Sequence, residues 1–172
     1  VSYYSDGNND SRLLENTNNG NFIDVTAATG INQNLNHEID LPSGFYFGDR
    51  LSASWGDFNN DGSPDIAVTM RFYQVVILLG KGDGFFNEPV TFNVKGQPTG
   101  IVVGDYNKDD NMDIAVGLAG SGNTGVQILW GKGDGKFDGS KVFKGGKQPL
   151  TVVNIDVNND GYLDLVTSSN SL

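Results

Sequence analysis

A nine-residue acidic pattern, Asp-x-Asn-x-Asp-[Gly/Asp]-x-x-Asp, occurs three times in this chain of 172 residues. The copies occupy residues 57–65, 105–113 and 156–164, so their first residues are 48 and 51 positions apart. β-branched and aliphatic residues, which favour strands, follow each copy at once. A repeat of this length, made of short apolar runs and tight turns, is typical of a propeller blade or a related array of β-sheets. The recurrence therefore predicts a modular all-β fold.

A glycine-rich turn recurs with the same spacing. The sequence Leu-Gly-Lys-Gly-Asp-Gly-Phe-Phe at residues 79–86 matches Trp-Gly-Lys-Gly-Asp-Gly-Lys-Phe at residues 130–137, and residues 16–22 hold a more divergent copy. Turns of this kind join neighbouring antiparallel strands. Each unit is therefore expected to be a blade of four short antiparallel strands. In the third unit the strands are expected at about 100–105, 113–117, 126–130 and 141–144.

Alignment of the copies divides the chain into blades. Residues 1–50 are expected to form strands two to four of a first blade and to carry a long connecting loop at 31–50. Residues 51–99 and 100–149 would form two complete blades, and residues 150–172 would begin a fourth. A closed propeller has at least four blades. We therefore expect a partial propeller, completed by further blades from a longer chain or from another subunit.

The acidic pattern has the spacing of an oxygen-donor loop. Alternate residues of a tight loop can direct their oxygen atoms to one centre, and carboxylate, amide and backbone carbonyl oxygens are the ligands that Ca²⁺ prefers. Without a cation, three carboxylates held close together repel one another. The sequence therefore predicts about three calcium ions. The candidate ligands are Asp57, Asn59, Asp61, Ser63, Asp65, Asp105, Asn107, Asp109, Asn111, Asp113, Asp156, Asn158, Asp160, Tyr162 and Asp164.

The loops do not match an EF-hand. An EF-hand loop has a glutamate at position 12 and lies between helices. Here position 12 is Val68, Val116 or Thr167, within a strand-forming run. The alternative is three polar turns, because Asp and Asn favour turns, but three copies in one register favour calcium. The middle loop departs most from the pattern, since Asp110 stands where glycine is preferred.

Composition excludes several classes of function. Acidic residues outnumber basic ones 21 to 11, and the resulting net charge of −10 disfavours nucleic acid and anionic membranes as partners. The longest aliphatic run, residues 75–79, is far too short to span a membrane, so we expect no direct membrane insertion. The absence of cysteine excludes a disulfide framework, a zinc-thiolate site and a thiol nucleophile. A single histidine leaves little for histidine-based catalysis.

These motifs resemble the FG-GAP/VCBS repeat family, whose members include the β-propeller of integrin α subunits. The resemblance lies in the three acidic loops with their trailing strands and in the glycine-rich turn at 79–86. Residues 11–16 and 21–26 are similar to the ASPIC-associated variant of these repeats. The resemblance implies a seven-bladed propeller in complete members, with calcium bound between the first two strands of a blade. It also implies an extracellular role in adhesion or recognition.

Loop positions in a blade separate two faces. The loops between strands one and two share a face, and the loops between strands two and three lie on the other. The resemblance implies that partners bind on this second face, where the turn at 71–73 combines one charge with two rings. The alternative for each candidate is an ordinary packed turn residue. The candidate partner contacts are Phe45, Tyr46, Phe47, Asp49, Arg50, Arg71, Phe72 and Tyr73.

Three functions remain open from the sequence. The first is a non-catalytic, calcium-stabilised, lectin-like or adhesion module that binds protein or carbohydrate outside the cell, where calcium is abundant enough to fill weak sites. The second is an accessory or catalytic domain of a secreted carbohydrate- or lipid-active enzyme, which would need two free carboxylates if it were a glycosidase. The third is a half-propeller chain that assembles with another. No catalytic constellation is visible, so the first is preferred. The acids unassigned near the long loop are Asp24, Glu38, Asp40 and Asp49.

Overall fold

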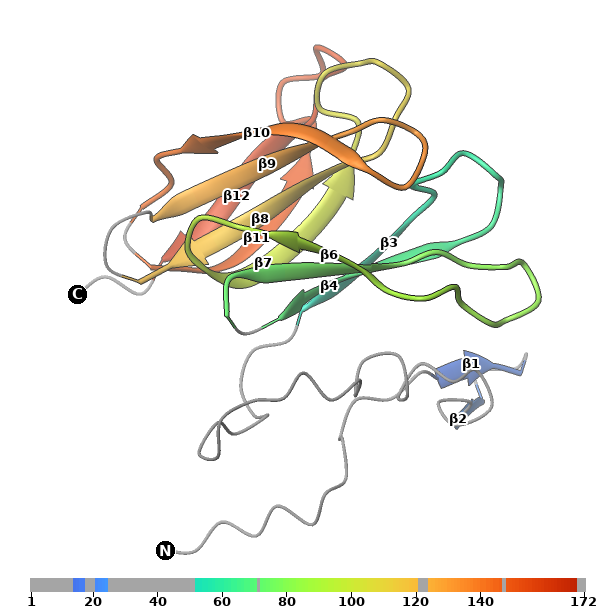
Figure 1. The fold of residues 1–172 in the computed structure, drawn as a ribbon. Coiled ribbons are helices and arrows are strands. Elements are labelled where there is room, and N and C mark those ends of the chain that lie inside the picture. Colours follow the sequence, from blue (N-terminus) through green and yellow to red (C-terminus); the bar gives the residue numbers. More distant parts are fainter. Residues whose placement is uncertain are drawn as a thin grey trace, which may run out of the picture.

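The computed structural model describes residues 14–17, 21–24, 52–70, 72–120, 124–146 and 148–169. These residues form twelve strands in four antiparallel sheets and no helix (Figure 1), which confirms the predicted all-β class. The strands are β1 (Leu14–Asn16), β2 (Phe22–Asp24), β3 (Ala53–Gly56), β4 (Asp65–Met70), β5 (Gln74–Leu78), β6 (Val90–Asn93), β7 (Gln97–Gly104), β8 (Asp113–Ala119), β9 (Gly125–Gly131), β10 (Phe137–Phe143), β11 (Pro149–Ile155) and β12 (Asp164–Ser169).

Two sheets have four strands each, and two have only two. β3–β6 form one four-stranded sheet and β7–β10 form the other, and in both the strands pair in chain order. We call these the complete sheets. β1–β2 and β11–β12 form the two-stranded sheets, which we call the half-sheets. Hairpin connections between consecutive strands give the antiparallel, blade-like order that the repeat predicts.

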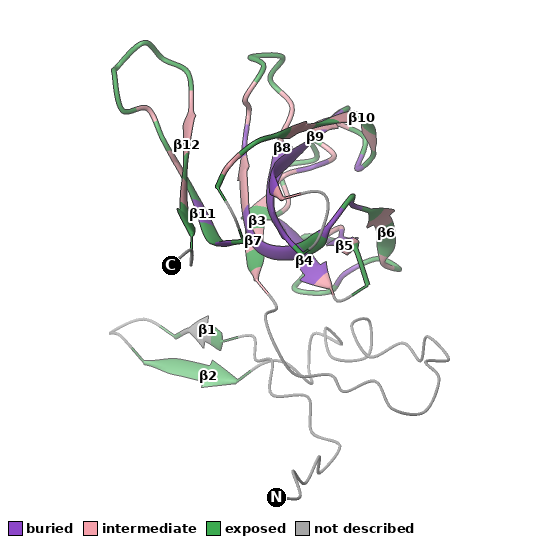
Figure 2. Ribbon diagram, turned by 90° about the vertical axis from the view of Figure 1, so that its left-hand side faces the viewer, coloured by how far each residue is buried: buried purple, intermediate pink, exposed green. Residues whose placement is uncertain are grey.

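The two complete sheets share one register. Ile66 of β4 pairs with Leu78 of β5, and the equivalent residues Ile114 and Leu129 pair in β8 and β9. The inner strands β4, β5, β8 and β9 are almost continuous apolar runs, and nearly all of their residues are buried (Figure 2). The outer strands β6 and β10 are mostly exposed. Continuous apolar runs form here because the inner strands are covered on both faces.

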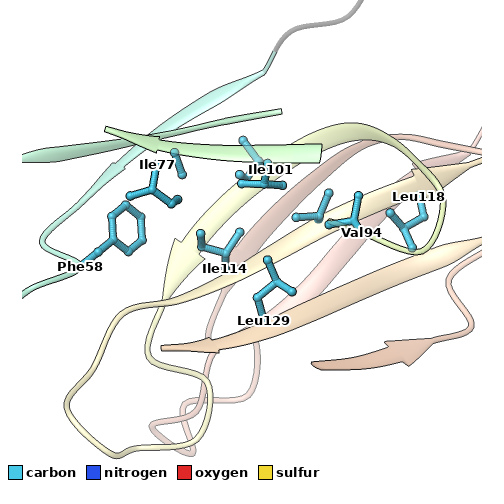
Figure 3. Close-up of a cluster of buried hydrophobic side chains, with 10 residues drawn as sticks. Phe58, Ile77, Val94, Ile101, Ile114, Leu118 and Leu129 are labelled. Atoms are coloured by element: carbon cyan, nitrogen blue, oxygen red, sulfur yellow. The ribbon is translucent and has the colours of Figure 1, made fainter. Parts of the chain in front are cut away.

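The main core lies between the complete sheets. Ile77 comes from the first sheet, Ile114 and Leu129 come from the second, and Phe58 closes the end near the loops (Figure 3). The Phe58 ring meets the Phe137 ring edge-on, with 5.9 Å between centroids. Each fully buried aliphatic side chain of this kind contributes about 1.5–3 kcal/mol to folding. The stacking of one complete sheet on the next is therefore the main source of stability.

The half-sheet β11–β12 stacks on the other face of the second complete sheet. Ala115 and Ile128 form an apolar cluster with Val152 of β11. The β11 backbone approaches so closely that a Cβ on Gly100 would lie 2.8 Å from the Val152 nitrogen. The side-chain amide of Asn154 donates to the Val103 carbonyl at 2.9 Å. Successive sheets thus stack face to face as blades do.

Candidate metal-binding loops

The three acidic patterns form equivalent loops between the first two strands of successive sheets. Residues 57–65 join β3 to β4, residues 105–113 join β7 to β8, and residues 156–164 join β11 to β12. All fifteen predicted ligands lie in these acidic loops, which extend from the same end of the sheets (Figure 1). The structure therefore brings the predicted residues into three similar settings.

Side-chain oxygens in the first loop accept hydrogen bonds from the loop's own backbone. Asp57 accepts from the N–H groups of Asp61 and Gly62, at 3.2 and 2.9 Å. Asn59 accepts from the Asp61 N–H at 3.1 Å and donates its amide to the Asp61 carboxylate at 2.7 Å. The other Asp61 oxygen accepts from the Ser63 N–H at 2.7 Å. The short polar side chains thus define the turn, as Asx turns do.

The second and third loops repeat all five of these bonds at 2.8 to 3.2 Å. The fourth and sixth residues of each loop have a positive φ. Glycine occupies the sixth position in the first and third loops, whereas Asp110 adopts a φ of 66° in the second. The middle loop therefore keeps the same shape despite the residue that the sequence marked as a departure.

Hydrogen bonding favours the ionised form of the fifth residue in each loop. The pKa values of Asp61, Asp109 and Asp160 are lowered, chiefly by the backbone N–H two residues later and next by the asparagine side chain. These carboxylates therefore remain charged at neutral pH, and each acidic loop presents exposed negative charge.

The ninth residue has a structural role that the sequence did not reveal. Asp65 is fully buried and accepts from the N–H groups of Phe58 and Gly80, both at 2.7 Å. Asp113 does the same with Tyr106 and Gly131, at 2.9 and 2.8 Å. Each carboxylate thus fastens the start of its acidic loop to the end of the third strand. We call this arrangement the aspartate clamp.

Burial and hydrogen bonding act in opposite directions on the clamp carboxylates. Burial raises the pKa values of Asp65 and Asp113 and outweighs the two N–H groups, which lower them. Asp164, the equivalent residue of the third loop, is only partly buried and accepts from the Val157 N–H at 3.0 Å. This difference was not predictable from the local pattern, because the glycine whose N–H completes the clamp, Gly80 or Gly131, lies 15 or 18 residues beyond its aspartate.

Neighbouring acidic loops contact each other directly. The Asn60 amide donates to the Asn111 side-chain oxygen at 3.0 Å, which joins the first loop to the second. The Lys108 ammonium lies 3.8 Å from the centre of the Tyr162 ring, which joins the second to the third. A Cβ on Gly133 would collide with both Asn60 and Asn111, so this glycine lets the glycine-rich turn pack against two loops. None of these contacts was predicted.

The donor atoms of the loops are of the kind that calcium prefers, but they are not arranged as a preformed metal centre. At its first, third, fifth and ninth positions each loop carries three carboxylates and one amide oxygen, all hard donors. Within the described residues, no three Asp, Glu or His side chains come together as a metal centre would require. The oxygens instead accept backbone N–H groups. A cation would therefore have to draw the donors together.

Two of the eight predicted partner contacts lie in the described part of the chain. Phe72 and Tyr73 form the β4–β5 turn, which follows Met70 at the end of β4 remote from the acidic loop. Both side chains are exposed, and both residues have a positive φ, of 66° and 65°. Such a φ is uncommon for bulky side chains. The other six, Phe45, Tyr46, Phe47, Asp49, Arg50 and Arg71, lie outside the described residues.

Comparison with protein-family models agrees with this architecture, whereas a search of curated proteins found no significant match. In the described residues no helix has the length and apolar character to cross a membrane. The FG-GAP-like repeat model matches residues 57–116 and 118–167, which together make up more than half of the chain. Such repeats are typical of extracellular, adhesion-type propeller modules and are generally non-catalytic. The chain therefore belongs to the FG-GAP-like repeat family.

Proposed function

We propose that this chain is a non-catalytic recognition module that is stabilised by calcium and binds protein or carbohydrate outside the cell. The observation that supports this proposal is the threefold recurrence of one oxygen-rich loop with the same internal hydrogen bonds. A polar turn needs no such constancy at three separate positions. The general absence of catalysis in FG-GAP-like repeats supports the non-catalytic part.

Calcium would act by fixing the acidic loops. One ion in each loop would be held by side-chain oxygens of its first, third, fifth and ninth residues and by the backbone of the seventh. The ion would offset charge repulsion that the loop's hydrogen bonds leave in place. Because binding would include the cost of drawing the donors together, we expect dissociation constants of about 10⁻⁴–10⁻³ M, the range of extracellular modules.

Recognition is assigned to the face opposite the acidic loops. Phe72 and Tyr73 place two exposed rings in one turn there, in a backbone conformation that costs of order 1–3 kcal/mol per residue. Aromatic side chains are common among residues that dominate binding. A turn that presents two exposed rings suits a carbohydrate ring or an apolar protein side chain.

Isothermal titration with CaCl₂ tests the calcium proposal. We expect about three ions per chain, and a melting temperature that falls in chelator and recovers when calcium is added. Asp61→Asn, Asp109→Asn and Asp160→Asn should each remove about one ion, since each changes an exposed carboxylate in a different loop.

A matched variant outside the loops controls for the lost charge. Asp83→Asn changes an exposed turn aspartate that also accepts a backbone N–H, from Phe85 at 3.0 Å. It should leave the number of bound ions unchanged. The proposal is wrong if the unaltered chain takes up no calcium at millimolar concentration, or if Asp83→Asn loses as much binding as the loop variants.

Glycan and protein arrays test recognition separately. The fluorescently labelled chain should bind a restricted set of probes in calcium, and the double variant Phe72→Ala with Tyr73→Ala should lose that binding by at least tenfold. Phe85→Ala removes an exposed ring from the glycine-rich turn near the acidic loops and should retain binding. Equal loss in both variants would contradict this assignment of the recognition face.

A further inference from the structure

The fourth residue of an acidic loop contacts the seventh residue of the next loop. In the first loop the fourth residue is Asn60, whose amide donates to the Asn111 side chain at 3.0 Å. In the second loop it is Lys108, whose ammonium lies 3.8 Å from the centre of the Tyr162 ring. The two contacts join the same positions of successive loops and are therefore equivalent. The first contact is neutral, whereas the second brings a positive charge to the third acidic loop.

The Lys108 ammonium lies close to the backbone of the third loop. A Cβ on Gly161, the sixth residue of that loop, would be 3.0 Å from the ammonium nitrogen. A Cβ on Gly62, the equivalent residue of the first loop, would meet nothing within 4 Å. The absence of a side chain at Gly161 therefore leaves room for the lysine that reaches over from the second loop.

The shape of the second loop does not require a lysine at its fourth position. Lys108 has a φ of 61°, and the equivalent Asn60 and Asn159 both have a φ of 57°. Asparagine is favoured over other non-glycine residues in this left-handed conformation. Lys108 thus occupies a position where the other two loops carry the residue better suited to the backbone. Its distinguishing property is its charge.

That charge acts on a carboxylate of the third loop. The pKa of Asp160 is lowered chiefly by the Tyr162 N–H, and the positive charge of Lys108 lowers it further. Among the described residues, no lysine contributes in this way to the lowered pKa values of Asp61 and Asp109, the equivalent carboxylates. Lys108 therefore offsets part of the negative charge of the third loop, and the first two loops have no equivalent counter-ion.

We propose that Lys108 regulates the third calcium site, because its ammonium lies at the third acidic loop and weakens calcium binding to that loop. This inference rests on the proposed function and names a residue that sets the affinity of one of its sites. A calcium ion and the ammonium repel each other if both are held at the loop. If the ammonium moves away instead, its contact with the Tyr162 ring is lost. Either response lowers the affinity of the third loop for calcium.

The coupling between the ion and the lysine acts in both directions. In the calcium-free chain the ammonium reduces repulsion among the carboxylates of the third loop. Thermodynamic linkage requires calcium in that loop to weaken the contact of Lys108 with Tyr162 by the same factor by which the contact weakens calcium binding. Calcium would therefore exchange a contact between the second and third loops for coordination within the third.

One backbone amide in each loop can report when that loop is filled. The N–H of the sixth residue donates to the first aspartate of its own loop, at 2.9, 3.0 and 2.8 Å in the three loops. A calcium ion held by that aspartate would change this hydrogen bond and the chemical shift of the amide. Titration of the isotope-labelled chain with CaCl₂, followed by proton–nitrogen correlation NMR, therefore gives a separate midpoint for each loop. The reporter amides are those of Gly62, Asp110 and Gly161.

Removal of the charge should tighten calcium binding to the third loop. Lys108→Asn introduces the residue that the other two loops have at this position, and Lys108→Met keeps an unbranched side chain without the charge. Both variants should fold, because Lys108 is exposed. In both, the calcium midpoint of the Gly161 amide should fall by about threefold to tenfold, the size expected for loss of a like charge near a divalent ion in water. The midpoint of the Gly62 amide should stay unchanged.

A charge-conserving variant separates the effect of charge from that of side-chain shape. Lys108→Arg keeps the positive charge and can also rest on the Tyr162 ring, so the Gly161 midpoint should stay within about twofold of that of the unaltered chain. Salt provides a second control. In about 1 M KCl, where the Debye length is about 3 Å, the gain of affinity in Lys108→Asn should largely disappear.

The titration distinguishes failure of this inference from failure of the calcium proposal. The regulatory role of Lys108 is overturned if both neutral variants change the Gly161 midpoint by less than about threefold, or if Lys108→Arg tightens binding as much as they do. In either case, reporter amides that respond to calcium would leave the calcium proposal standing. If none of the three amides responds to millimolar calcium, the calcium proposal and this inference are both wrong.

Discussion

The second complete sheet and the half-sheet β11–β12 carry the same acidic loop in two different settings. In the complete sheet, Asp113 is fully buried and accepts two backbone N–H groups. In the half-sheet, Asp164 is partly buried and one accepted N–H is described. The hydrogen bonds within the loop are nevertheless the same. The nine-residue pattern therefore shapes its own turn, whereas the third and fourth strands determine how firmly that turn is fastened.

Truncation of buried side chains should give the largest difference in stability loss between the second complete sheet and the half-sheet β11–β12. Ile114→Ala removes a fully buried side chain from the core between the complete sheets, and we expect a loss of about 2–5 kcal/mol in the free energy of unfolding. Leu165→Ala, at the equivalent place in the half-sheet, should lose less than half as much because Leu165 is only partly buried. Urea unfolding measures both losses. Equal losses would contradict the difference in packing.

Removal of the clamp carboxylate should have the next largest effect. Asp113→Ala leaves the N–H groups of Tyr106 and Gly131 without their acceptor, which should cost roughly 2–4 kcal/mol. Asp164→Ala should cost about 1 kcal/mol or less. Urea unfolding in chelator excludes any contribution from calcium. Equal losses would show that Asp164 is held as firmly as Asp113, which would contradict the comparison.

The sixth position of the middle loop offers a gain in stability. Asp110 adopts a φ of 66°, which a glycine would adopt without a clash of its Cβ. Asp110→Gly should therefore raise the free energy of unfolding by about 0.5–1 kcal/mol. Gly62→Asp makes the reverse change in the first loop and should lower it by a similar amount. Thermal unfolding in chelator would detect both, and a loss on Asp110→Gly would show that the aspartate side chain is itself a stabilising contact.

The contact between the second and third loops should give the smallest effect. Lys108→Met removes the ammonium from the Tyr162 ring, and we expect a loss of about 0.5 kcal/mol. Lys141→Met removes a longer contact, 4.9 Å from the Phe143 ring within β10, and should change stability less. The comparison of melting temperatures shows whether loops on successive sheets are coupled. No difference between the variants would mean that the loops behave independently.

Much of the fold follows from local pattern. The strands at 113–119 and 125–131 and the glycine-rich turn between β9 and β10 lie where the repeat predicts them. β7 begins at Gln97, earlier than the expected residue 100, because a bulge between Pro98 and Ile101 extends its pairing. Strand propensity and turn chemistry act over a few residues, so these features could be derived without contacts between distant segments.

The candidate site was only partly predictable, because many of its contacts join residues that are far apart in the sequence. The acidic residues and their spacing identified the loops, and the calcium assignment remains a prediction. The clamp between Asp65 and Gly80, the contact of Lys108 with Tyr162, and the packing of Gly133 against two loops join residues far apart in the sequence. No periodic signal marks such contacts.

The repeat, the all-β class and the shape of each acidic loop follow from local sequence alone, because strand formation and Asx turns depend on residues within a short window. Which equivalent residues are buried and which remain exposed became clear from the packing of the sheets. Val166 and Ala115 occupy the same position in their strands, yet in the part of the chain that the structure describes only Ala115 has a third strand beside it and another sheet against its face. Burial depends on neighbouring strands and sheets, which the local sequence does not contain.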